Sequence, residues 1–270
     1  MNKVYLMCLA FIASLLTWSS SFNIVSAQSP DVVIPVPAEV TMTKGTYKFE
    51  ELPKIKVVYS AKGFENPEAY SMKITPKGIT IRASGEAGVF YAHQTLAQMT
   101  RDGAVKEIRC CEIFDSPRFP YRGMHFDVSR HFRSLDFLKR QVDVMASFKM
   151  NRMHIHLTDA AGWRMQIDAY PRLTDFAAWR PQVTWKDWWT ADRSYVEEGT
   201  PGAYGGYYTK EEMRELVEYA RERHIEVIPE IEMPSHSEEV LAAYPELGCS
   251  NEAYRDCDFC VGSEKTFGFL

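Results

Sequence analysis

Acidic residues and one histidine follow three short apolar runs of this 270-residue sequence. These residues are Asp127, Asp159, Glu230, Glu232 and His236. Carboxylates and imidazoles bind hydroxyl groups and move protons, so they are candidates for general acid and base chemistry. Parallel α/β sheets bind their ligands where the carboxyl ends of the strands meet. If the three runs are strands of one such sheet, the five side chains lie together, although solvated loop acids would give the same pattern.

A long connection rich in tryptophan follows the second apolar run. Residues 158–207 are far longer than the usual link between a strand and a helix, and such long loops usually carry function. The tryptophans in this connection are Trp163, Trp179, Trp185, Trp188 and Trp189. Because indole faces pack on the apolar faces of pyranose rings, acids beside tryptophans fit a sugar site. Tryptophans of a hydrophobic core are the alternative.

The pair His154 and His156 suggests a different chemistry. Residues two apart in a strand share a face, so two imidazoles there can bind a divalent metal ion, as in a metal-dependent hydrolase. The alternation of a buried strand explains the same spacing. The sequence shows no third ligand at a matching distance, so we predict no metal site.

Alternating strands and helices must position these residues. After residue 116 the pattern predicts strand, helix, strand, helix and strand over residues 122–128, 134–149, 152–157, 209–223 and 225–231. Ser134 can cap the first helix, and Thr209 with Glu212 forms a capping box at the second. This order predicts an α/β fold with a parallel sheet and right-handed crossovers.

The preceding residues, 28–116, have a different pattern. They start with an extended stretch around Pro35 and Pro37, and one helix is predicted between residues 86 and 100. Strands are predicted over residues 55–59, 70–74, 79–83 and 105–109. These elements are typical of a small α+β domain. Pro117 and Pro120 mark the linker to the α/β part.

The N-terminus has the pattern of a signal peptide. Lys3 precedes an apolar run over residues 4–18, and small residues at 25–27 end at Ala27. The run is shorter than the roughly 20 apolar residues that span a bilayer, which argues against a retained membrane anchor. We therefore predict cleavage after Ala27 and a secreted or periplasmic protein that is not bound to a membrane.

Charge and cysteine content narrow the class of protein. The 31 Lys and Arg against 36 Asp and Glu give a net charge of −5 without a basic stripe, which argues against a nucleic-acid partner. Five cysteines follow residue 27, an odd number in an oxidising compartment. Cys249, Cys257 and Cys260 predict a local disulfide, without indicating which two pair. A zinc knuckle is the weaker alternative because the adjacent pair at 110–111 is no second ligand pair at usable spacing.

Four ordered segments resemble glycoside hydrolase family 20, the β-N-acetylhexosaminidases. They are residues 121–132 (YRGMHFDVSRHF), 154–164 (HIHLTDAAGWR), 229–236 (PEIEMPSH) and, in the smaller domain, 78–81 with 91–96. The resemblance covers nearly all of residues 35–270. Four blocks at family-like spacing form a far more specific signal than any single short motif.

This resemblance implies a (β/α)8 TIM barrel behind the small α+β domain. It also implies a glycosidase that releases terminal β-linked N-acetylglucosamine or N-acetylgalactosamine from an oligosaccharide or glycoconjugate. In the family the 2-acetamido oxygen of the substrate attacks the anomeric carbon, and the configuration is retained. An adjacent Asp-Glu pair assists, the Asp by orienting the acetamide and the Glu as acid and then base. No metal or organic cofactor is implied.

Three residues receive roles from their positions in the family's motifs. The resemblance implies that Arg122 hydrogen-bonds hydroxyls of the terminal sugar. It implies that Asp159 orients His236, whose other nitrogen faces the catalytic Glu and tunes its proton affinity. Ala160 and Ala161 depart from the family, which often has an acid or amide and then a glutamine after the motif Asp.

A larger departure is that no Asp in the sequence is followed directly by Glu. A complete barrel has eight strands and about 250 residues, whereas three strands are predicted here. We therefore expect a signal peptide (1–27), a small α+β domain (28–116) and an incomplete (β/α)8 barrel of about three βα units (117–270). Made alone, this chain is expected to be poorly folded, aggregation-prone and hydrolytically inactive. A non-catalytic sugar-binding or degenerate module is the alternative.

Overall fold

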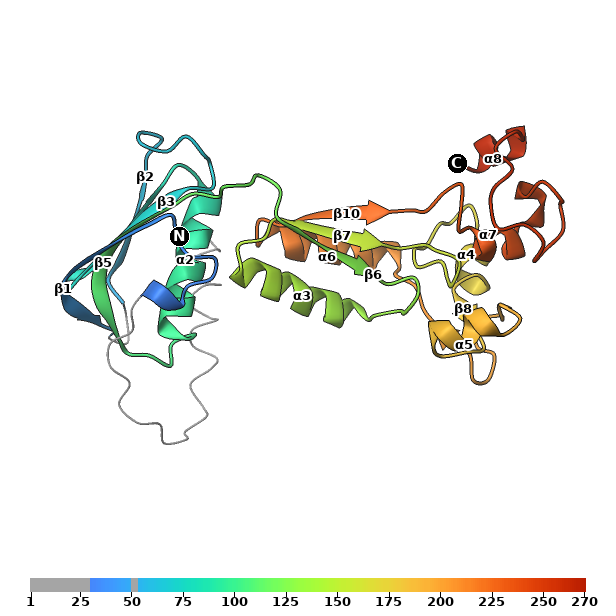
Figure 1. The fold of residues 1–270 in the computed structure, drawn as a ribbon, viewed down its shortest axis with the longest axis horizontal. Coiled ribbons are helices and arrows are strands. Elements are labelled where there is room, and N and C mark those ends of the chain that lie inside the picture. Colours follow the sequence, from blue (N-terminus) through green and yellow to red (C-terminus); the bar gives the residue numbers. More distant parts are fainter. Residues whose placement is uncertain (1–29, 50–52) are drawn as a thin grey trace. The chain divides into compact units, whose positions relative to one another are not determined.

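The computed structural model describes residues 30–49 and 53–270 (Figure 1). The predicted signal peptide and its cleavage site after Ala27 lie outside the described residues. The chain divides into two compact units, one comprising the residues up to Pro120 with Ser147–Lys149, the other Tyr121–Ala146 with Met150–Leu270. Within the described part of the chain, no helix is long and apolar enough to cross a membrane.

A five-stranded sheet and one long helix form the first unit (Figure 1). Its elements are η1 (Pro30–Val32), β1 (Glu39–Lys48), β2 (Ile55–Tyr59), β3 (Tyr70–Thr75), β4 (Gly78–Ala83), α2 (Glu86–Thr100) and β5 (Glu107–Asp115). The strand order is β1-β5-β3-β4-β2, and neighbours are antiparallel except β2 and β4. Tyr91, Leu96 and Met99 of α2 are buried in one core with apolar residues of the sheet.

Strand β1 differs from the sequence prediction, which gives only an extended stretch near the start of this unit. The strand pairs antiparallel with β5 on both sides of an irregularity in its middle. Most of its side chains are exposed because β1 is an edge strand, so no apolar alternation marks it in the sequence. The register shifts between Met42 and Thr46, where Gly45 has a φ of 100° that favours glycine.

A parallel sheet flanked by helices forms the base of the second unit. Its elements are β6 (Gly123–Asp127), α3 (Leu135–Ser147), β7 (Arg152–His156), α6 (Lys210–Arg221) and β10 (Glu226–Glu230). The strands lie in the order β10-β7-β6 and both pairs are parallel, which confirms the predicted arrangement. Over the described residues this sheet has three strands and does not close into a barrel.

Local signals in the sequence account for both helices of this sheet. Thr209 and Glu212 form the predicted capping box at α6, with each side chain bonded to the other residue's backbone N–H. The Ser134 hydroxyl accepts a hydrogen bond from the Phe137 backbone N–H at the start of α3. Each helix then buries one apolar face, through Leu138 and Val142 in α3 and through Leu216 in α6.

Short elements fill the segments after β7 and β10. The connection from β7 to α6 contains α4 (Arg172–Asp175), β8 (Trp179–Arg180), α5 (Trp185–Thr190) and β9 (Tyr204–Gly205). The segment after β10 contains α7 (Glu238–Ala243), η2 (Pro245–Leu247) and α8 (Glu264–Phe269). The two segments share one apolar core, in which Trp163 and Leu173 pack with Val240 and Leu247. Trp163 and Trp188 are buried, whereas Trp185 and Trp189 are exposed, so the tryptophans serve in part as core residues.

Two fully buried arginines hold the long connection against the end of the parallel sheet. The Arg164 guanidinium donates hydrogen bonds to the backbone carbonyls of Val128, Ser129, Ala161, Ala178 and Gly206. Arg180 donates to the carbonyls of Arg130, Ala161, Gln182 and Val183. Burial lowers the pKa of Arg164 to about 10. Both arginines therefore replace the hydrogen bonds that irregular backbone loses on burial.

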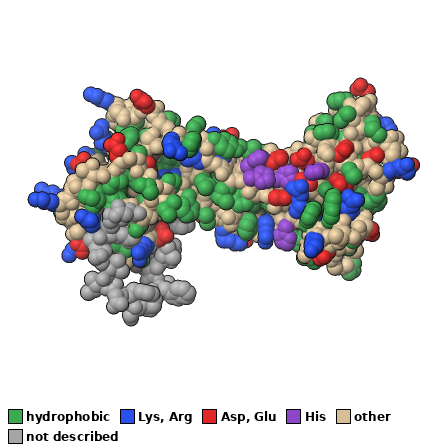
Figure 2. Space-filling model, viewed as in Figure 1, with side chains coloured by type: hydrophobic (Ala, Val, Ile, Leu, Met, Phe, Trp, Pro, Cys, Tyr) green, Lys and Arg blue, Asp and Glu red, His purple; other side chains and the backbone are tan. Residues whose placement is uncertain are grey.

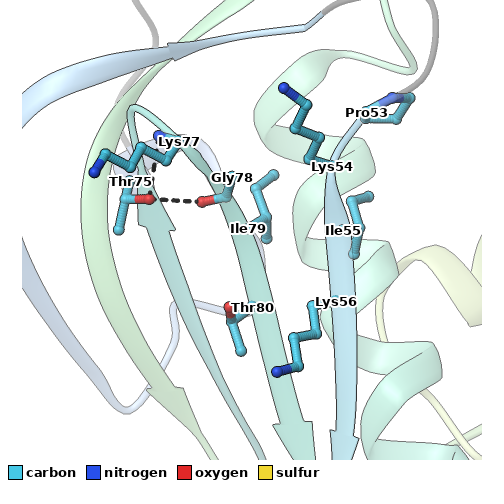
Figure 3. Close-up of a pocket in the computed structure, with 9 residues that line it drawn as sticks. All are labelled: Pro53, Lys54, Ile55, Lys56, Thr75, Lys77, Gly78, Ile79 and Thr80. Atoms are coloured by element: carbon cyan, nitrogen blue, oxygen red, sulfur yellow. Dashed lines mark hydrogen bonds between the residues drawn. The ribbon is translucent and has the colours of Figure 1, made fainter.

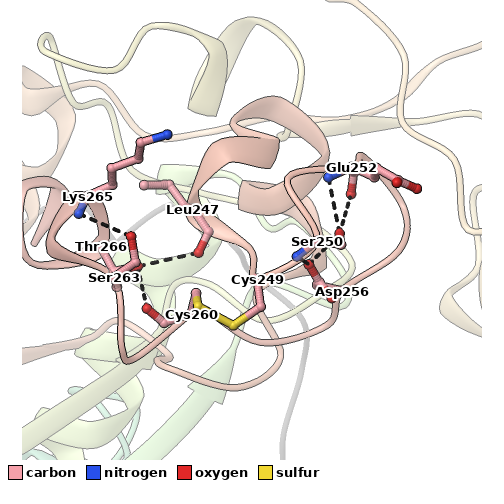
Figure 4. The surroundings of a disulfide bond; sticks show 9 residues. All are labelled: Leu247, Cys249, Ser250, Glu252, Asp256, Cys260, Ser263, Lys265 and Thr266. Atoms are coloured by element: carbon pink, nitrogen blue, oxygen red, sulfur yellow. Dashed lines mark hydrogen bonds between the residues drawn. A yellow bond between two sulfur atoms is a disulfide. The ribbon is translucent and has the colours of Figure 1, made fainter.

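A disulfide joins Cys249 and Cys260 (Figure 4), with a Cα–Cα distance of 4.7 Å. This confirms the predicted local disulfide and identifies its two cysteines. Cys257 is a free, exposed thiol, and Cys110 and Cys111 are free and buried. Inside the closed loop, the Asp256 carboxylate accepts hydrogen bonds from the backbone N–H and hydroxyl of Ser250.

Candidate active site

The strand register brings titratable side chains into two rows on one face of the parallel sheet. Asp127, His156 and Glu230 are direct neighbours across β6, β7 and β10, and His125 lies beside His154 in the row below. Since the strand order follows the chain order, right-handed crossovers put α3 and α6 on the opposite face. Figure 2 shows histidine side chains gathered with acidic and basic ones on one face of this unit.

Glu230 lies among three imidazoles. His154 Nε2 is 2.6 Å and His125 Nε2 is 3.3 Å from Glu230 Oε2, while His156 Nδ1 is 3.1 Å from Glu230 Oε1. The rings of His125 and His154 meet edge to face with centroids 4.7 Å apart. The sequence shows only the His-x-His pair, whereas the register adds a carboxylate and a further histidine from two other strands.

Asp159 is buried at the carboxyl end of β7 and connects several of the predicted site residues. Its side chain lies 2.8 Å from His156 Nε2, 3.4 Å from His236 Nδ1 and in direct contact with the Arg130 guanidinium. The Ser129 hydroxyl donates to the Asp159 carbonyl at 2.7 Å. The structure thus brings Asp159 and His236 together, as their predicted partnership requires.

Backbone geometry fixes the two loops that carry Asp159 and His236. Ala160 and His236 both have left-handed backbone, with φ of 39° and 52°, which is uncommon for residues other than glycine. The Ala160 backbone N–H donates to the His236 carbonyl at 2.7 Å. The Glu232 N–H donates to the Thr158 hydroxyl at 2.8 Å. These hydrogen bonds hold the ends of β7 and β10 together, while the His236 side chain stays 58% exposed.

Arg122 lies at the other end of the sheet from Asp159 and His236. It precedes β6, whose first residue is Gly123, and its backbone exchanges hydrogen bonds with Asn151, just before β7. The five-residue strand separates Arg122 from Asp127 by roughly 17 Å at about 3.3 Å per residue. The structure therefore does not bring Arg122 together with the other two predicted site residues, and a small shift of the strand boundary does not change this.

Arg130 is the arginine that the sequence analysis missed. It follows β6 by three residues, and its guanidinium bridges Asp127, at 2.9 Å, and Asp159. The Arg130 side chain is 31% exposed. Its carbonyl accepts a hydrogen bond from Arg180 at 2.9 Å. The signal was present in the sequence, because ligands bind at carboxyl ends of parallel strands and Arg130, unlike Arg122, follows its strand.

The pKa of His156 is raised and the pKa of Glu230 is lowered, and both shifts favour the charged forms of these two side chains. The hydrogen bond with Asp159 is the largest cause that raises the pKa of His156, with help from the Glu230 carboxylate and against the effect of burial. Burial alone raises the pKa of Glu230, but the imidazoles of His156, His125 and His154 together outweigh it and lower that pKa. Neighbouring charges, not solvent, therefore set the protonation of this cluster.

Glu239 is a second buried acid that the sequence analysis did not single out. It lies in α7, is 1% exposed, and its Oε2 atom has no hydrogen-bond partner within the described structure. Burial raises the pKa of Glu239 well above its ordinary value. A protonated carboxylic acid close to the strand ends can donate a proton or hydrogen bond, a property that single-sequence patterns do not reveal.

Two groups of side chains in the second unit have the composition and spacing of metal ligands. One consists of His125, His156 and Glu230, and the other of His156, Asp159 and Glu232. Within each group the donor atoms lie within 4.8 Å of one another. Neither group contains His154, so the pair of His154 and His156 considered in the sequence is not itself completed by a third ligand, and only His156 takes part in these groups.

The first unit also has an open hollow, between the start of β2 and the turn that joins β3 to β4 (Figure 3). Three lysines line it, Lys54, Lys56 and Lys77, with no acid or histidine among the described lining residues. Since lysine ammonium groups alone do not provide an acid and base pair at neutral pH, the candidate site remains in the second unit.

Comparisons with known proteins agree with this location. The family model for the catalytic domain of glycosyl hydrolase family 20 matches residues 119–269, and the model for domain 2 of that family matches residues 51–116. A β-hexosaminidase from Porphyromonas gingivalis is 36% identical over 219 residues, which are 75% of this chain and 26% of the relative. A β-hexosaminidase from Akkermansia muciniphila is 38% identical over 220 residues, 80% of this chain and 41% of the relative.

Among solved structures, the N-acetyl-β-hexosaminidase of Streptomyces plicatus in complex with Thio-NAglucal is similar, with a TM-score of 0.75 and 30% identity. The match covers 92% of this chain and 56% of that structure. The chain thus spans 26% and 41% of the two curated relatives and about half of the similar structure.

Proposed function

The chain belongs to glycosyl hydrolase family 20, and we propose on this basis that it is part of a glycosidase that releases terminal β-linked N-acetylhexosamine. The observation that carries the proposal is the family match over the same residues that form the polar edge of the parallel sheet. The substrate would be an oligosaccharide or glycoconjugate that carries N-acetylglucosamine or N-acetylgalactosamine. Nucleic acid is not an expected partner.

In the proposed reaction the 2-acetamido oxygen of the substrate attacks the anomeric carbon, with retention of configuration. Asp159 would orient His236 across the 3.4 Å that separates their side chains. The exposed edge of His236 is then available to a catalytic acid or to substrate. Neither residue is proposed to break the glycosidic bond, because that role requires an acid next to the leaving oxygen.

Arg130 is the better candidate for the sugar-binding role first considered for Arg122. Its guanidinium is held by Asp127 and Asp159 at the carboxyl ends of the strands, and its side chain is 31% exposed. A guanidinium presents paired donors that match two neighbouring hydroxyl groups. Arg122 lies at the opposite end of β6 and cannot reach the same sugar without a large rearrangement.

The fold that we propose for residues 117–270 is the first part, about three βα units, of an incomplete (β/α)8 barrel. The parallel order of β6, β7 and β10 and the similarity to the Streptomyces plicatus structure support it. Residues 28–116 would be the small α+β domain that precedes the barrel. Residues 1–27 would be a signal peptide, so that N-terminal sequencing of the mature, secreted or periplasmic protein should begin at Gln28.

The 270-residue chain by itself is proposed to be hydrolytically inactive, because it contains no Asp followed by Glu. The same absence favours the second candidate, a sugar-binding module without catalysis. The two candidates differ in a direct assay. Titration of the 270-residue chain with N-acetylglucosamine should show saturable binding if the module is selected for recognition, and none if the site needs further residues.

The test of the glycosidase uses the product of the complete reading frame that contains these codons. With a chromogenic N-acetyl-β-glucosaminide it should release the chromophore, and with the matching β-glucoside it should not, since the acetamido group is the nucleophile. Equal rates on the two substrates, or no turnover of either, would contradict the proposal.

A further inference from the structure

We propose that His125, His156 and Glu230 form a binding site for a divalent transition-metal ion of the Zn²⁺ class on the face of the parallel sheet that carries the histidines. The glycosidase function does not require this site, so the inference goes beyond the proposed function. It rests on donor spacing, on one buried nitrogen without a partner, and on the hydrogen bond behind that nitrogen.

The donor spacing fits a shared ion. His125 Nε2 lies 3.3 Å from Glu230 Oε2, and His156 Nδ1 lies 3.1 Å from Glu230 Oε1. Two donors at these separations, each about 2.1 Å from one ion, subtend an angle of about 95–105°, which is normal for a bound Zn²⁺ or a related ion.

His156 Nδ1 is the buried atom without a partner. The side chain of His156 is 6% exposed, and Nδ1 makes no hydrogen bond within the described structure although it lies 3.1 Å from a carboxylate oxygen. An unprotonated Nδ1 that faces the Glu230 carboxylate is repelled by it unless a cation lies between the two groups. No hydrogen bond joins His156 Nδ1 and Glu230 Oε1. A metal ion that lies to one side of the line between these two atoms could therefore bind both.

The opposite nitrogen of His156 has the partner that metal-binding histidines usually have. Nε2 lies 2.8 Å from Asp159 Oδ2, and an ionised carboxylate only accepts, so Nε2 carries a proton and Nδ1 is the nitrogen that a metal ion can bind in place of a second proton. Asp159 is itself held by Arg130. A carboxylate, a histidine and a metal in this order fix the ring and raise its basicity as a ligand.

The chemistry of the donors indicates the class of ion. Two imidazole nitrogens and one carboxylate suit Zn²⁺, Co²⁺ or Ni²⁺, whereas Mg²⁺ and Ca²⁺ prefer sets made only of oxygen. The second group, His156 with Asp159 and Glu232, is a weaker candidate because Arg130 already neutralises Asp159. His154 lies 2.6 Å from Glu230 and holds that carboxylate in place from below.

The test titrates Zn²⁺ into the product of the complete reading frame, purified without a polyhistidine tag and stripped of metal. Calorimetry should show one saturable Zn²⁺ site and no binding of Mg²⁺. The substitutions His125→Gln and Glu230→Gln should each weaken Zn²⁺ binding by more than about 100-fold, and Asp159→Asn by about 10- to 100-fold. Circular dichroism of each variant confirms that it is folded.

Two control variants separate this site from other ligands. His93→Gln changes a histidine of α2 in the first unit, and Cys257→Ser removes the exposed free thiol. Both should bind Zn²⁺ with unchanged affinity. In addition, Co²⁺ should broaden the imidazole resonances of His125 and His156 before those of His93.

Three results would overturn the proposal: no saturable Zn²⁺ binding, an affinity in the His125→Gln and Glu230→Gln variants equal to that of the unsubstituted protein, or loss of binding in the Cys257→Ser variant. The absence of saturable Zn²⁺ binding would mean that only a proton binds at His156 Nδ1. Because the readout is binding and not turnover, each result is independent of the glycosidase activity.

Discussion

The sheets of the two units use the same alternation of side chains in different ways. In β4 of the first unit, the buried Ile79 and Ile81 alternate with Thr80 and Arg82, and the direct cross-strand neighbours of Thr80 are Lys56 and Lys73. One face of each strand in that unit supplies the core beneath α2, and the rest meets solvent. The alternation there serves stability.

In β7 of the second unit, Met153 and Ile155 are fully buried, and they alternate with His154 and His156. The histidine face meets Glu230 and, through His156, Asp159. A period of two residues therefore identifies a strand in both units, but it does not identify the role of the side chains on the second face. That face must be judged from the residue types and from the neighbours that the register supplies.

Replacing the buried Arg164 should have the largest effect on stability. It asks whether the second unit depends on this arginine as the first unit depends on its apolar core. Arg164→Met leaves the carbonyls that Arg164 contacts without a donor, so we expect the second unit to lose about 3–5 kcal/mol of unfolding free energy. Native-state hydrogen exchange should show lost protection in β6 and β7 but not in β3 and β4.

Arg172→Met is the matched control, since Arg172 lies on the same connection but is 45% exposed and pairs with Glu197 at the surface. We expect this variant to change stability by less than about 1 kcal/mol. Equal losses in the two variants would mean that the carbonyl contacts of Arg164 do not matter.

A smaller effect contrasts one histidine from each unit. The hydrogen bond with Asp159 raises the pKa of His156, whereas burial lowers the pKa of His93. The stabilisation from His156 is fully present below the ordinary histidine pKa of about 6.5 and is lost as the pH rises through the raised value. Above a pH of about 6.5, His93 is neutral and does not affect the stability of the fold. As the pH falls below about 6.5 toward the lowered pKa of His93, this residue destabilises the fold.

Urea unfolding of His156→Gln and His93→Gln across this pH range measures the contrast. His156→Gln should remove the part of the stability that declines with rising pH, and His93→Gln the part that declines with falling pH. The same slope in both variants would show that the two histidines do not differ as described.

The smallest effects concern the helix starts. Helix α6 has the Thr209 capping box, whereas α2 begins at Gly85 without a side-chain cap. Thr209→Ala should cost about 1 kcal/mol, and Gly85→Ser should gain only a few tenths of a kcal/mol. A Cβ at Gly85 meets only the Pro67 carbonyl oxygen, at 3.7 Å. Thermal unfolding of both variants tests this, and a larger change for Gly85→Ser than for Thr209→Ala would contradict it.

Much of the fold was predictable because its main elements carry local signals. The apolar periodicity and the capping box locate α3 and α6, and β-branched residues locate β2 and β4 to within a residue or two. The edge strand β1 and the short helices α4 and α5 were not predicted. Edge exposure removes the alternation of β1, and contacts made by Arg164 and Arg180 position the short elements.

The sequence predicts only those residues of the candidate site whose placement depends on their position along a strand. Asp159 and His236 follow their strands, and the structure brings them together. Arg122 occupies a motif position but lies at the opposite end of β6 from these two residues, whereas Arg130 follows the strand. The contacts of Glu230 with three histidines depend on strand order and register, which a single sequence does not contain.

If the carboxyl ends of β6, β7 and β10 form the sugar site, the two arginines at opposite ends of β6 should differ in their effect on sugar binding. In the product of the complete reading frame, Arg130→Met should weaken binding of N-acetylglucosamine by about 10- to 100-fold, the value of hydrogen bonds from a charged donor. Arg122→Met should leave the affinity nearly unchanged. Loss of binding in Arg122→Met with normal binding in Arg130→Met would contradict the account.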